Sequence, residues 1–355
     1  MKVLTYESWN GQLNNVRMSF ECAVVLAFLL RRKLVVSTRF SPTSSAWMAE
    51  ILDLALLRRA VPLTCPTDRD YPDVLEEIER LPPGDTLEFD PYPKTPDKSR
   101  GQGPGTAILC SPGFPEEGTA EFERLRRFAA GRYGTRLPQN HESYSRIHLS
   151  PMLEHFYSFF FVPADVEREC KQLVKDFVRY RPEIVAAAKE ITGRLGAFAA
   201  MHVRRGDFLE ARPRQCFAGS AMVEATRAFL PPGGRLYIAT NETAPEFFDA
   251  FREHYEVVLF HDVAHIGARN MPSEWIAACE QLVCAEAQVF VGTMLSTFSG
   301  YVTRLRGYRN AEDQVFRFTD GTSDARGPTP DYSWRDTVRS RIALWGREYR
   351  EAWAC

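Results

Sequence analysis

Two adjacent arginines, Arg204 and Arg205, directly follow an apolar stretch at residues 198–203 that predicts a buried strand. A guanidinium stays charged at physiological pH, and its burial is unfavourable unless an anion or an acid faces it. Asp207 can pair with one of the two arginines but not comfortably with both. The surplus positive charge therefore predicts an anionic ligand, most simply a diphosphate.

Four polar segments each follow a predicted strand, and they cover residues 9–15, 202–207, 240–242 and 292–299. In open α/β sheets, ligands bind at the carboxyl ends of the strands. One segment belongs to the first half of the chain and three belong to the second half. We therefore expect the ligand to lie between two lobes.

The segment at residues 292–299 contains groups that can hold phosphate. The hydroxyls of Ser296 and Thr297, and the backbone N–H groups after Gly292, stand at the start of an expected helix. Arg204 adds a forked pair of charge-assisted donors, each worth about 1.5–3 kcal/mol. Together these groups predict a nucleoside diphosphate as the ligand.

Three of these segments also have purely structural interpretations. Gly11 with Asn14 and Asn15 is equally typical of a turn and helix cap, and residues 293 and 296–299 are equally typical of a cap. Residues 241–243 match a glycosylation sequon, although their place after a strand favours turn chemistry. The first strand is followed by neither a Walker pattern nor a Gly-x-Gly-x-x-Gly pattern, which argues against P-loop and dinucleotide sites.

Extended and helical patterns alternate along the chain and predict an α/β fold. A strand at 2–6, a helix at 18–30 and a strand at 34–36 predict a βαβ unit with a parallel sheet. The second half predicts strands at 198–203, 236–239, 257–260 and 289–291, with helices at 164–195, 220–229 and 274–287. We expect two doubly wound domains, covering residues 1–190 and 191–355.

Two segments stand outside this alternation. Residues 81–118 hold eight prolines and six glycines in 38 positions and predict a long irregular loop. Such a loop in the first domain could shape the choice of acceptor. The last segment, residues 333–355, carries three tryptophans at helical intervals, and we expect it to pack on the body of the protein.

Composition and charge exclude several classes of protein. The chain has 355 residues, 45% of them hydrophobic and 25% charged, which is typical of a globular protein. The net charge of −2 argues against nonspecific binding to nucleic acid or to membranes. The longest apolar run has nine residues, against about 20 for a spanning helix. The eight cysteines show no zinc-binding spacing, so we expect no metal site.

Three segments together resemble the GDP-fucose protein O-fucosyltransferase family. They are residues 11–19 (GQLNNVRMS), 201–208 (MHVRRGDF) and 284–299 (CAEAQVFVGTMLSTFS). Their order and spacing match across about residues 1–310, and the resemblance is strongest to the thrombospondin-repeat type and to fucosyltransferase-like proteins of plants and algae. It implies a GT-B fold with two Rossmann-like lobes, GDP-fucose in the cleft, and inverting transfer without an essential metal.

The resemblance also implies roles for individual residues. Arg204 would hold the β-phosphate and stabilise the leaving GDP, with His202 beside the nucleotide and Asn14 reaching the diphosphate or the sugar. Glu280 would bind guanine through both carboxylate oxygens. The remaining residues expected to bind GDP-fucose are Gly11, Asn15, Ser296, Thr297 and Phe298.

The chain departs from the family pattern in the first lobe. Some relatives carry a glutamate there as catalytic base, and the matching position in this chain is Gly11. Asp207, Glu242 and Glu7 are candidates to replace it, and Asp207 stands with Arg204 as a candidate catalytic residue. Other relatives work through a loose, oxocarbenium-like transition state without an obvious base.

The acceptor and the compartment stay open at this stage. We expect fucose transfer to a serine or threonine of a folded protein module. The alternatives are a glycan-directed fucosyltransferase of the same fold and a GDP-sugar-binding protein without catalysis. Relatives work in the ER and Golgi lumen, whereas the first residues of this sequence resemble no signal peptide, so either a leader has been removed or the protein is cytosolic.

Overall fold

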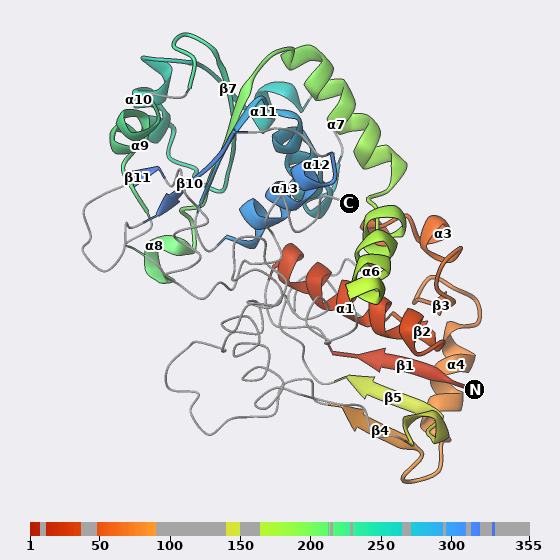
Figure 1. Cartoon of the computed structure of the whole chain (residues 1–355). Helices are drawn as coiled ribbons and strands as arrows, with labels where there is room; N and C mark the ends of the chain where they lie inside the picture. Colours follow the sequence, from red (N-terminus) through yellow and green to blue (C-terminus); the bar gives the residue numbers. More distant parts are fainter. Residues whose placement is uncertain are drawn as a thin grey trace. The chain divides into compact units, whose positions relative to one another are not determined.

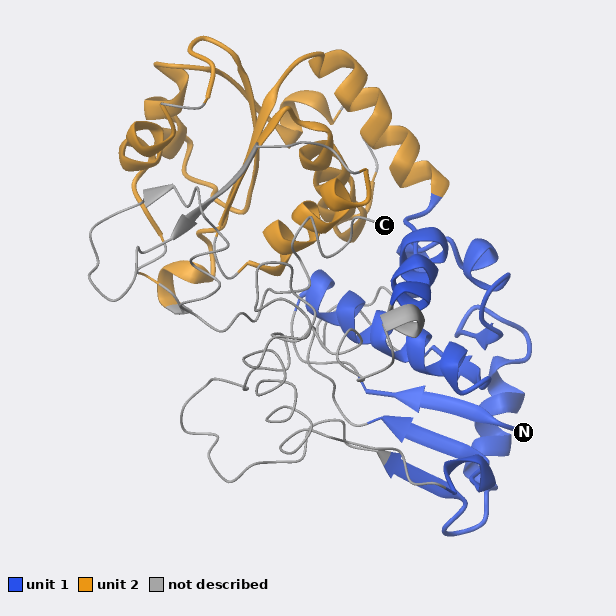
Figure 2. Cartoon of the chain, viewed as in Figure 1, with its two compact units in different colours: residues 1–181, 342–347, 355 blue, residues 182–341, 348–354 orange. Residues whose placement is uncertain are grey.

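The computed structural model describes residues 1–7, 12–36, 48–89, 140–149, 164–211, 213, 216–227, 230–264, 271–293, 296–309, 314–319 and 329–330. The described residues form two compact units, which divide between Arg181 and Pro182 (Figure 2). The sequence predicted a boundary near residue 190, a position that lies inside helix α7 (Pro182–Leu195). The units divide at the start of that helix. Pro182 suits the first helical position, where no N–H donor is needed.

The first unit is built on a parallel sheet of five strands in the order β3-β2-β1-β5-β4 (Figure 1). Its strands are β1 (Val3–Tyr6), β2 (Lys33–Val35), β3 (Leu63–Thr64), β4 (Thr86–Phe89) and β5 (Arg146–Leu149). Its helices are α1 (Leu13–Leu29), α2 (Met48–Ile51), α3 (Leu54–Leu57), α4 (Tyr71–Glu79), the 3-10 turn η3 (His141–Ser143) and α6 (Ala164–Phe177). The parallel pairing of β1 with β2 confirms the predicted βαβ opening.

Helix α1 begins five residues earlier than its apolar stripe predicts, at Leu13 rather than Met18. The extra turn is polar in sequence but buried in the fold. Arg17 and Glu21 form an ion pair inside the unit with Nε and Oε1 3.0 Å apart, and Arg17 also donates to the carbonyl of Val178. A hydrophobicity pattern misses this turn because its charges are satisfied by each other and by the backbone.

Two expectations for the first unit are corrected. Residues 81–118 are not wholly irregular, because Thr86–Phe89 forms strand β4 beside β5, while residues 90–118 lie outside the described residues. The surrounding prolines and glycines obscured this short alternating strand. The helix expected at 164–195 is two helices, interrupted where the Arg181 N–H bonds the carbonyl of Ile51. The proline at 182 disfavours helical backbone at the residue before it.

The second unit is built on a six-stranded sheet in the order β11-β10-β9-β6-β7-β8, parallel except for β11. Its strands are β6 (Ala199–Val203), β7 (Arg235–Thr240), β8 (Glu256–Leu259), β9 (Val289–Thr293), β10 (Gln314–Thr319) and β11 (Thr329–Pro330). Its helices are α7, α8 (Phe208–Ala211), α9 (Gly219–Thr226), the 3-10 helix η6 (Pro245–Phe248), α10 (Asp249–Arg252), α11 (Phe260–Val263), α12 (Ser273–Glu286) and α13 (Thr297–Gly307). All four strands predicted here are confirmed, and the chain is an α/β protein with mainly parallel sheets.

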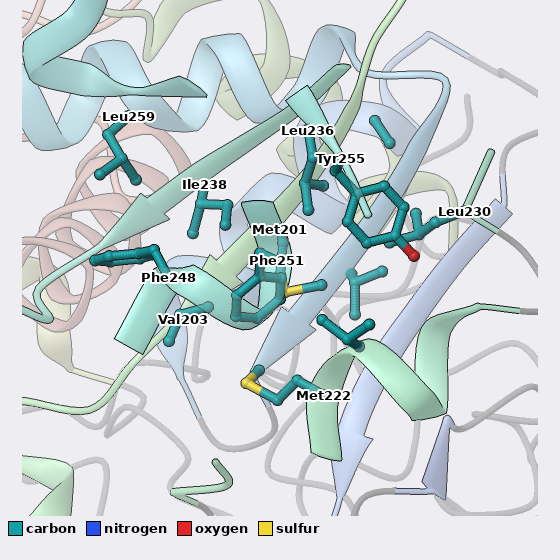
Figure 3. Close-up of a cluster of buried hydrophobic side chains, with 13 residues drawn as sticks. Met201, Val203, Met222, Leu230, Leu236, Ile238, Phe248, Phe251, Tyr255 and Leu259 are labelled. Atoms are coloured by element: carbon teal, nitrogen blue, oxygen red, sulfur yellow. The ribbon is translucent and has the colours of Figure 1, made fainter. Parts of the chain in front are cut away.

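The two faces of this second sheet differ in character. On one face, Met201, Leu236 and Ile238 join a buried apolar cluster with side chains from α9, η6 and α10 (Figure 3). Because side chains alternate along a strand, the neighbouring residues His202 and Tyr237 lie on the opposite face, toward α12 and α13. The apolar face anchors the sheet, and the other face carries polar groups.

Helix α12 is fixed to this second face by a buried arginine of α13. Arg306 is fully buried, and its Nη1 donates to the carbonyls of Ala285 and Ala287 at the end of α12, at 3.2 and 2.5 Å. A cation among the last carbonyls satisfies acceptors that have no partner within the helix. The link joins the C-terminal ends of α12 and α13 at the amino end of β9, opposite the end where residues 292 and 293 lie.

None of the helices in the described ranges is long and apolar enough to cross a membrane. The predicted helical tail at 333–355 lies outside the described residues.

Candidate functional site

The strand order of the second unit places its candidate site at the carboxyl ends of β6 and β9, which are neighbouring central strands. From β6 the chain proceeds outward to β7 and β8 on one side, and from β9 to β10 and β11 on the other. Ligands of open α/β sheets bind at such a switch point, outside the carboxyl ends of the strands. Residues 202–207 follow or end β6, and residues 292–299 end β9, so two of the predicted polar segments meet there.

Thr293 joins these two segments through hydrogen bonds. Its hydroxyl donates to the carbonyl of His202 at 2.7 Å and accepts from the backbone N–H of Arg204 at 3.2 Å. Thr293 therefore does not cap the following helix, as one interpretation of the sequence held. It holds the start of the Arg204 loop against the end of β9.

Arg204 presents its guanidinium beside an exposed acid. Its Nη2 lies 2.8 Å from Oδ1 of Asp207, and Asn241 also donates to this oxygen at 3.4 Å. The Arg204 side chain is 17% exposed and that of Asp207 is 51% exposed, so the pair lies at the surface of the carboxyl edge. A charge-assisted pair in this position is open to exchange with a phosphate.

Arg205 corrects the expectation of a surplus cation. Its Nε donates to Oε2 of Glu242 at 2.6 Å, its Nη1 donates to the carbonyl of Phe217 at 2.7 Å, and its guanidinium lies over the ring of Phe247. Each arginine therefore faces a carboxylate, and charge alone does not demand an external anion. Glu242 is 37 residues away from Arg205 in the sequence, so the partner could not be identified before the strands were placed.

Glu242 is unsuited to act as a base. Burial favours its neutral form, but hydrogen bonds from the Ala244 N–H, from Arg205 and from the Thr243 N–H outweigh this and lower its pKa. A base must take up a proton readily near the working pH. Glu242 instead serves to hold Arg205.

The Arg204–Arg205 loop turns at a glycine for steric reasons. The backbone N–H of Arg205 donates to Oδ1 of Asn241 at 2.9 Å. A Cβ atom added at Gly206 would stand 2.2 Å from Nδ2 of this asparagine. The third predicted segment, at residues 240–242, therefore supports the loop of the second.

The N-terminus of α13 lies at the same edge. Ser296 occupies the N-cap position with extended backbone, yet its side chain makes no capping bond and has no hydrogen-bond partner among the described residues. Thr297 and Phe298 are half-buried, and the Phe298 ring stacks on the imidazole of His202 with centroids 4.2 Å apart. Free N–H groups of a helix start, with a spare hydroxyl, form a site suited to an anion.

Glu280 belongs to α12, which covers the same face of the sheet. The phenol of the fully buried Tyr237 donates to its Oε1 at 3.2 Å. Burial raises the pKa of Glu280 to about 8, although the Tyr237 hydrogen bond acts the other way. The residue expected to read guanine as a carboxylate is therefore largely protonated in the free protein at neutral pH.

The remaining candidates belong to the first unit. Asn14 is buried near the start of α1, and the side-chain oxygen of Asn15 is buried without a hydrogen-bond partner among the described residues. Gly11 lies outside the described residues. Glu7 is exposed, and its Oε1 lies 3.5 Å from Nε2 of His148. Their part in a site with the second unit stays a prediction.

Sequence reasoning missed several residues that shape the site. Thr293, Asn241 and Ser299 stood within the predicted polar segments and were interpreted only as cap or turn residues, because their partners lie on other elements. Tyr237 gave no signal at all, since it occupies an apolar strand. Within the described ranges, no group of three or more His, Cys, Asp or Glu side chains is placed to hold a metal ion.

Comparison with solved structures finds a fold similar to that of two fucosyltransferases. The crystal structure of POFUT1 in complex with GDP superposes with a TM-score of 0.52 and 15% identity, covering 89% of this chain and 98% of that one. The α-1,6-fucosyltransferase NodZ from Bradyrhizobium gives a TM-score of 0.51 at 15% identity, covering 93% and 98%. These likenesses concern the fold.

Sequence comparison defines the family. The family model for GDP-fucose protein O-fucosyltransferase matches residues 116–309, more than half of the chain. GDP-fucose protein O-fucosyltransferase 2 of Drosophila melanogaster is 31% identical over 110 residues, 29% of this chain and 22% of that protein. The aligned stretch thus spans about a fifth of the length of this relative. The chain belongs to the GDP-fucose protein O-fucosyltransferase family, as its motifs suggested.

Proposed function

We propose that the protein transfers fucose from GDP-fucose to a serine or threonine hydroxyl of a protein acceptor, with inversion at the sugar carbon. The observation that carries the proposal is that the Arg204 loop and the start of α13 both follow strands of the β6–β9 switch point, where the Thr293 hydroxyl accepts the Arg204 N–H. Both supply positive potential to one place, which is what a leaving diphosphate requires. Membership of the family is the reason to propose GDP-fucose as the sugar donor.

In this proposal the donor diphosphate lies against the second unit. Arg204 moves from Asp207 to the β-phosphate, and Asp207 holds the guanidinium ready until then. The hydroxyls of Ser296 and Thr297 and the N–H groups of α13 bind phosphate oxygens, while His202 and Phe298 lie beside the nucleotide and Glu280 reads the guanine. Asn14, Asn15 and Gly11 would complete the site from the first unit, in a GT-B arrangement of two Rossmann-like domains.

Stabilisation of the leaving group, rather than a strong base, carries the rate in this mechanism. Glu242 is held by Arg205, and Asp207 is paired with Arg204. The acceptor oxygen bonds to C1 of fucose as the bond from C1 to the diphosphate breaks, and the hydroxyl proton passes to water or to the departing diphosphate. Negative charge grows on the phosphate that Arg204 and α13 face in this proposal. Removing one such donor lowers turnover by about 10²-fold in comparable sites. The proposed reaction needs no metal.

The test is transfer of labelled fucose from GDP-fucose to folded peptide modules and to free glycans, with and without EDTA. We expect label on a hydroxyl of the peptide module, unaffected by EDTA and reduced at least about 10²-fold in Arg204→Ala. The matched control is Arg227→Ala, which removes an exposed arginine that forms an ion pair with Glu224 of α9.

Two other outcomes would overturn the proposal in different ways. Label on glycans alone would make the protein a glycan-directed fucosyltransferase. Binding of GDP-fucose without transfer or hydrolysis would make it a GDP-sugar-binding protein, an outcome that the glycine at position 11 favours.

A further inference from the structure

The imidazole of His202 is held by a serine of α13. The Nδ1 atom of His202 lies 2.8 Å from Oγ of Ser299, and both residues are buried, with exposures of 3% and 1%. The same Ser299 oxygen accepts the backbone N–H of Thr293 at 2.8 Å. Every polar contact of this hydroxyl among the described residues is therefore with these two groups.

The direction of the His202–Ser299 hydrogen bond follows from the available protons. The Thr293 N–H can only donate, so the Ser299 oxygen accepts it. The hydroxyl proton then needs an acceptor in a buried place, and among the described residues the lone pair of Nδ1 is the one within reach. His202 must therefore be neutral and carry its proton on Nε2. Burial and the positive charge of Arg204 lower the pKa of His202 to about 3, so the ring is not protonated at neutral pH.

Two further contacts fix the ring. Phe298 stacks on the imidazole with an angle of 23° between the planes. Ser299 lies against Gly292, where an added Cβ would stand 2.9 Å from both Cβ and Oγ of the serine. The hydroxyl and the ring plane are thus set from two sides by α13 and β9.

The Nε2–H of His202 is left as a donor without a partner among the described residues, in a side chain that is almost fully buried. The ring belongs to the same strand end as Arg204 and is stacked on the first turn of α13. The donor therefore belongs to the proposed phosphate side of the site.

We propose that Ser299 is a positioning residue that locks His202 as the Nε2–H tautomer, making this histidine a fixed hydrogen-bond donor to an oxygen of the bound nucleotide. The inference rests on the proposed function for the identity of the ligand, but not for the tautomer. It assigns a role to the last serine of the 296–299 segment. It also excludes His202 as the general base, since its one basic nitrogen is taken by Ser299.

The first test is the tautomer of His202 in the ligand-free protein. Proteins labelled with 15N at histidine give nitrogen shifts that distinguish the two neutral tautomers and the cation. His202→Gln identifies the signal among the seven histidines. We expect the Nε2–H tautomer at neutral pH, and either the Nδ1–H tautomer or a cationic ring would overturn the proposal.

The second test is a double-mutant cycle on GDP affinity. Ser299→Ala should produce a mixture of tautomers and weaken GDP binding about tenfold, as loss of a partner that orients a histidine does elsewhere. His202→Asn keeps an acceptor for Ser299 but has no donor at the Nε2 position, so Ser299→Ala should have no further effect in that background. Ser220→Ala, at an exposed serine of α9, is the control.

The outcomes separate this proposal from the proposed function. An unchanged tautomer and affinity in Ser299→Ala, or equal losses in both backgrounds, would overturn the role of Ser299. The expected tautomers without any GDP binding would refute the nucleotide site and leave the positioning of His202 by Ser299 supported.

Discussion

Arg204 and Arg205 are adjacent in the sequence, yet their side chains have different surroundings. Arg205 is bound by Glu242 and a backbone carbonyl in the body of the unit, which makes it a structural cation. Arg204 faces Asp207, whose side chain is half exposed and whose place a diphosphate can take. At the scale of single residues, the partner of each arginine therefore distinguishes the structural Arg205 from Arg204, the candidate ligand-binding residue.

The raised pKa of Glu280 leads to a prediction about how GDP binding depends on pH. The free protein holds its proton up to a pKa of about 8, whereas guanine N1–H and N2–H bind an ionised carboxylate. GDP binding below pH 8 should therefore release a proton, and affinity should rise with pH by up to about tenfold per unit before it levels off above pH 8. Calorimetry in buffers of different ionisation enthalpy measures this release.

Glu280→Gln is the matched variant, because it keeps the shape and cannot ionise. It should weaken GDP binding and abolish the proton release that comes from Glu280. Any proton that GDP itself releases on binding should be the same with both proteins. Equal proton release by the two proteins would mean that Glu280 does not read guanine.

At the scale of elements, the packing of α13 on β9 positions the groups that we propose to bind phosphate. Gly292→Ala would bring a Cβ to within 2.9 Å of Ser299 and 3.2 Å of the Phe290 ring. We expect the start of α13 to shift, with GDP affinity weakened at least about tenfold and the protein destabilised by about 1–3 kcal/mol. Binding and urea unfolding measure the two effects.

Gly193→Ala is the control for added bulk. A Cβ at this position of α7 meets nothing within 4 Å, and alanine favours helix over glycine by about 1 kcal/mol. This variant should be as stable as the parent protein or more so, with unchanged GDP binding. Equal behaviour of the two glycine variants would show that the β9–α13 contact does not set the site.

The sequence predicted elements better than it predicted contacts. Strands β1, β2, β6, β7, β8 and β9 were predicted because their apolar runs are interrupted by clear turn residues. Strand β4 and the break before Pro182 were missed, because a short strand among prolines and a helix interruption leave little periodic signal. At the site, His202 and Arg204 were predicted from local pattern, whereas Glu242 and Tyr237 needed the strand order to be known.

At the scale of the whole molecule, both units are α/β and each has its own sheet (Figures 1 and 2). The two sheets differ in strand order. The second unit alone brings together Arg204, the α13 N-terminus, His202 and Glu280. We therefore expect this unit to determine which nucleotide binds, while the first unit contributes Asn14 and Asn15 and the acceptor side of the reaction.

The most direct measurement is thermal unfolding of the full chain with GDP, GDP-fucose, UDP and ADP, in the parent protein, Arg204→Ala and Arg227→Ala. A ligand at 100 times its dissociation constant stabilises the folded state by about 2.7 kcal/mol. A domain of this size shifts by about 2–4 °C per kcal/mol, so this stabilisation raises the melting temperature by roughly 5–11 °C. We expect this shift with the two guanine nucleotides only, lost in Arg204→Ala and kept in Arg227→Ala. No shift with any guanine nucleotide, or an equal shift with UDP, would contradict a GDP-fucose site at the β6–β9 edge.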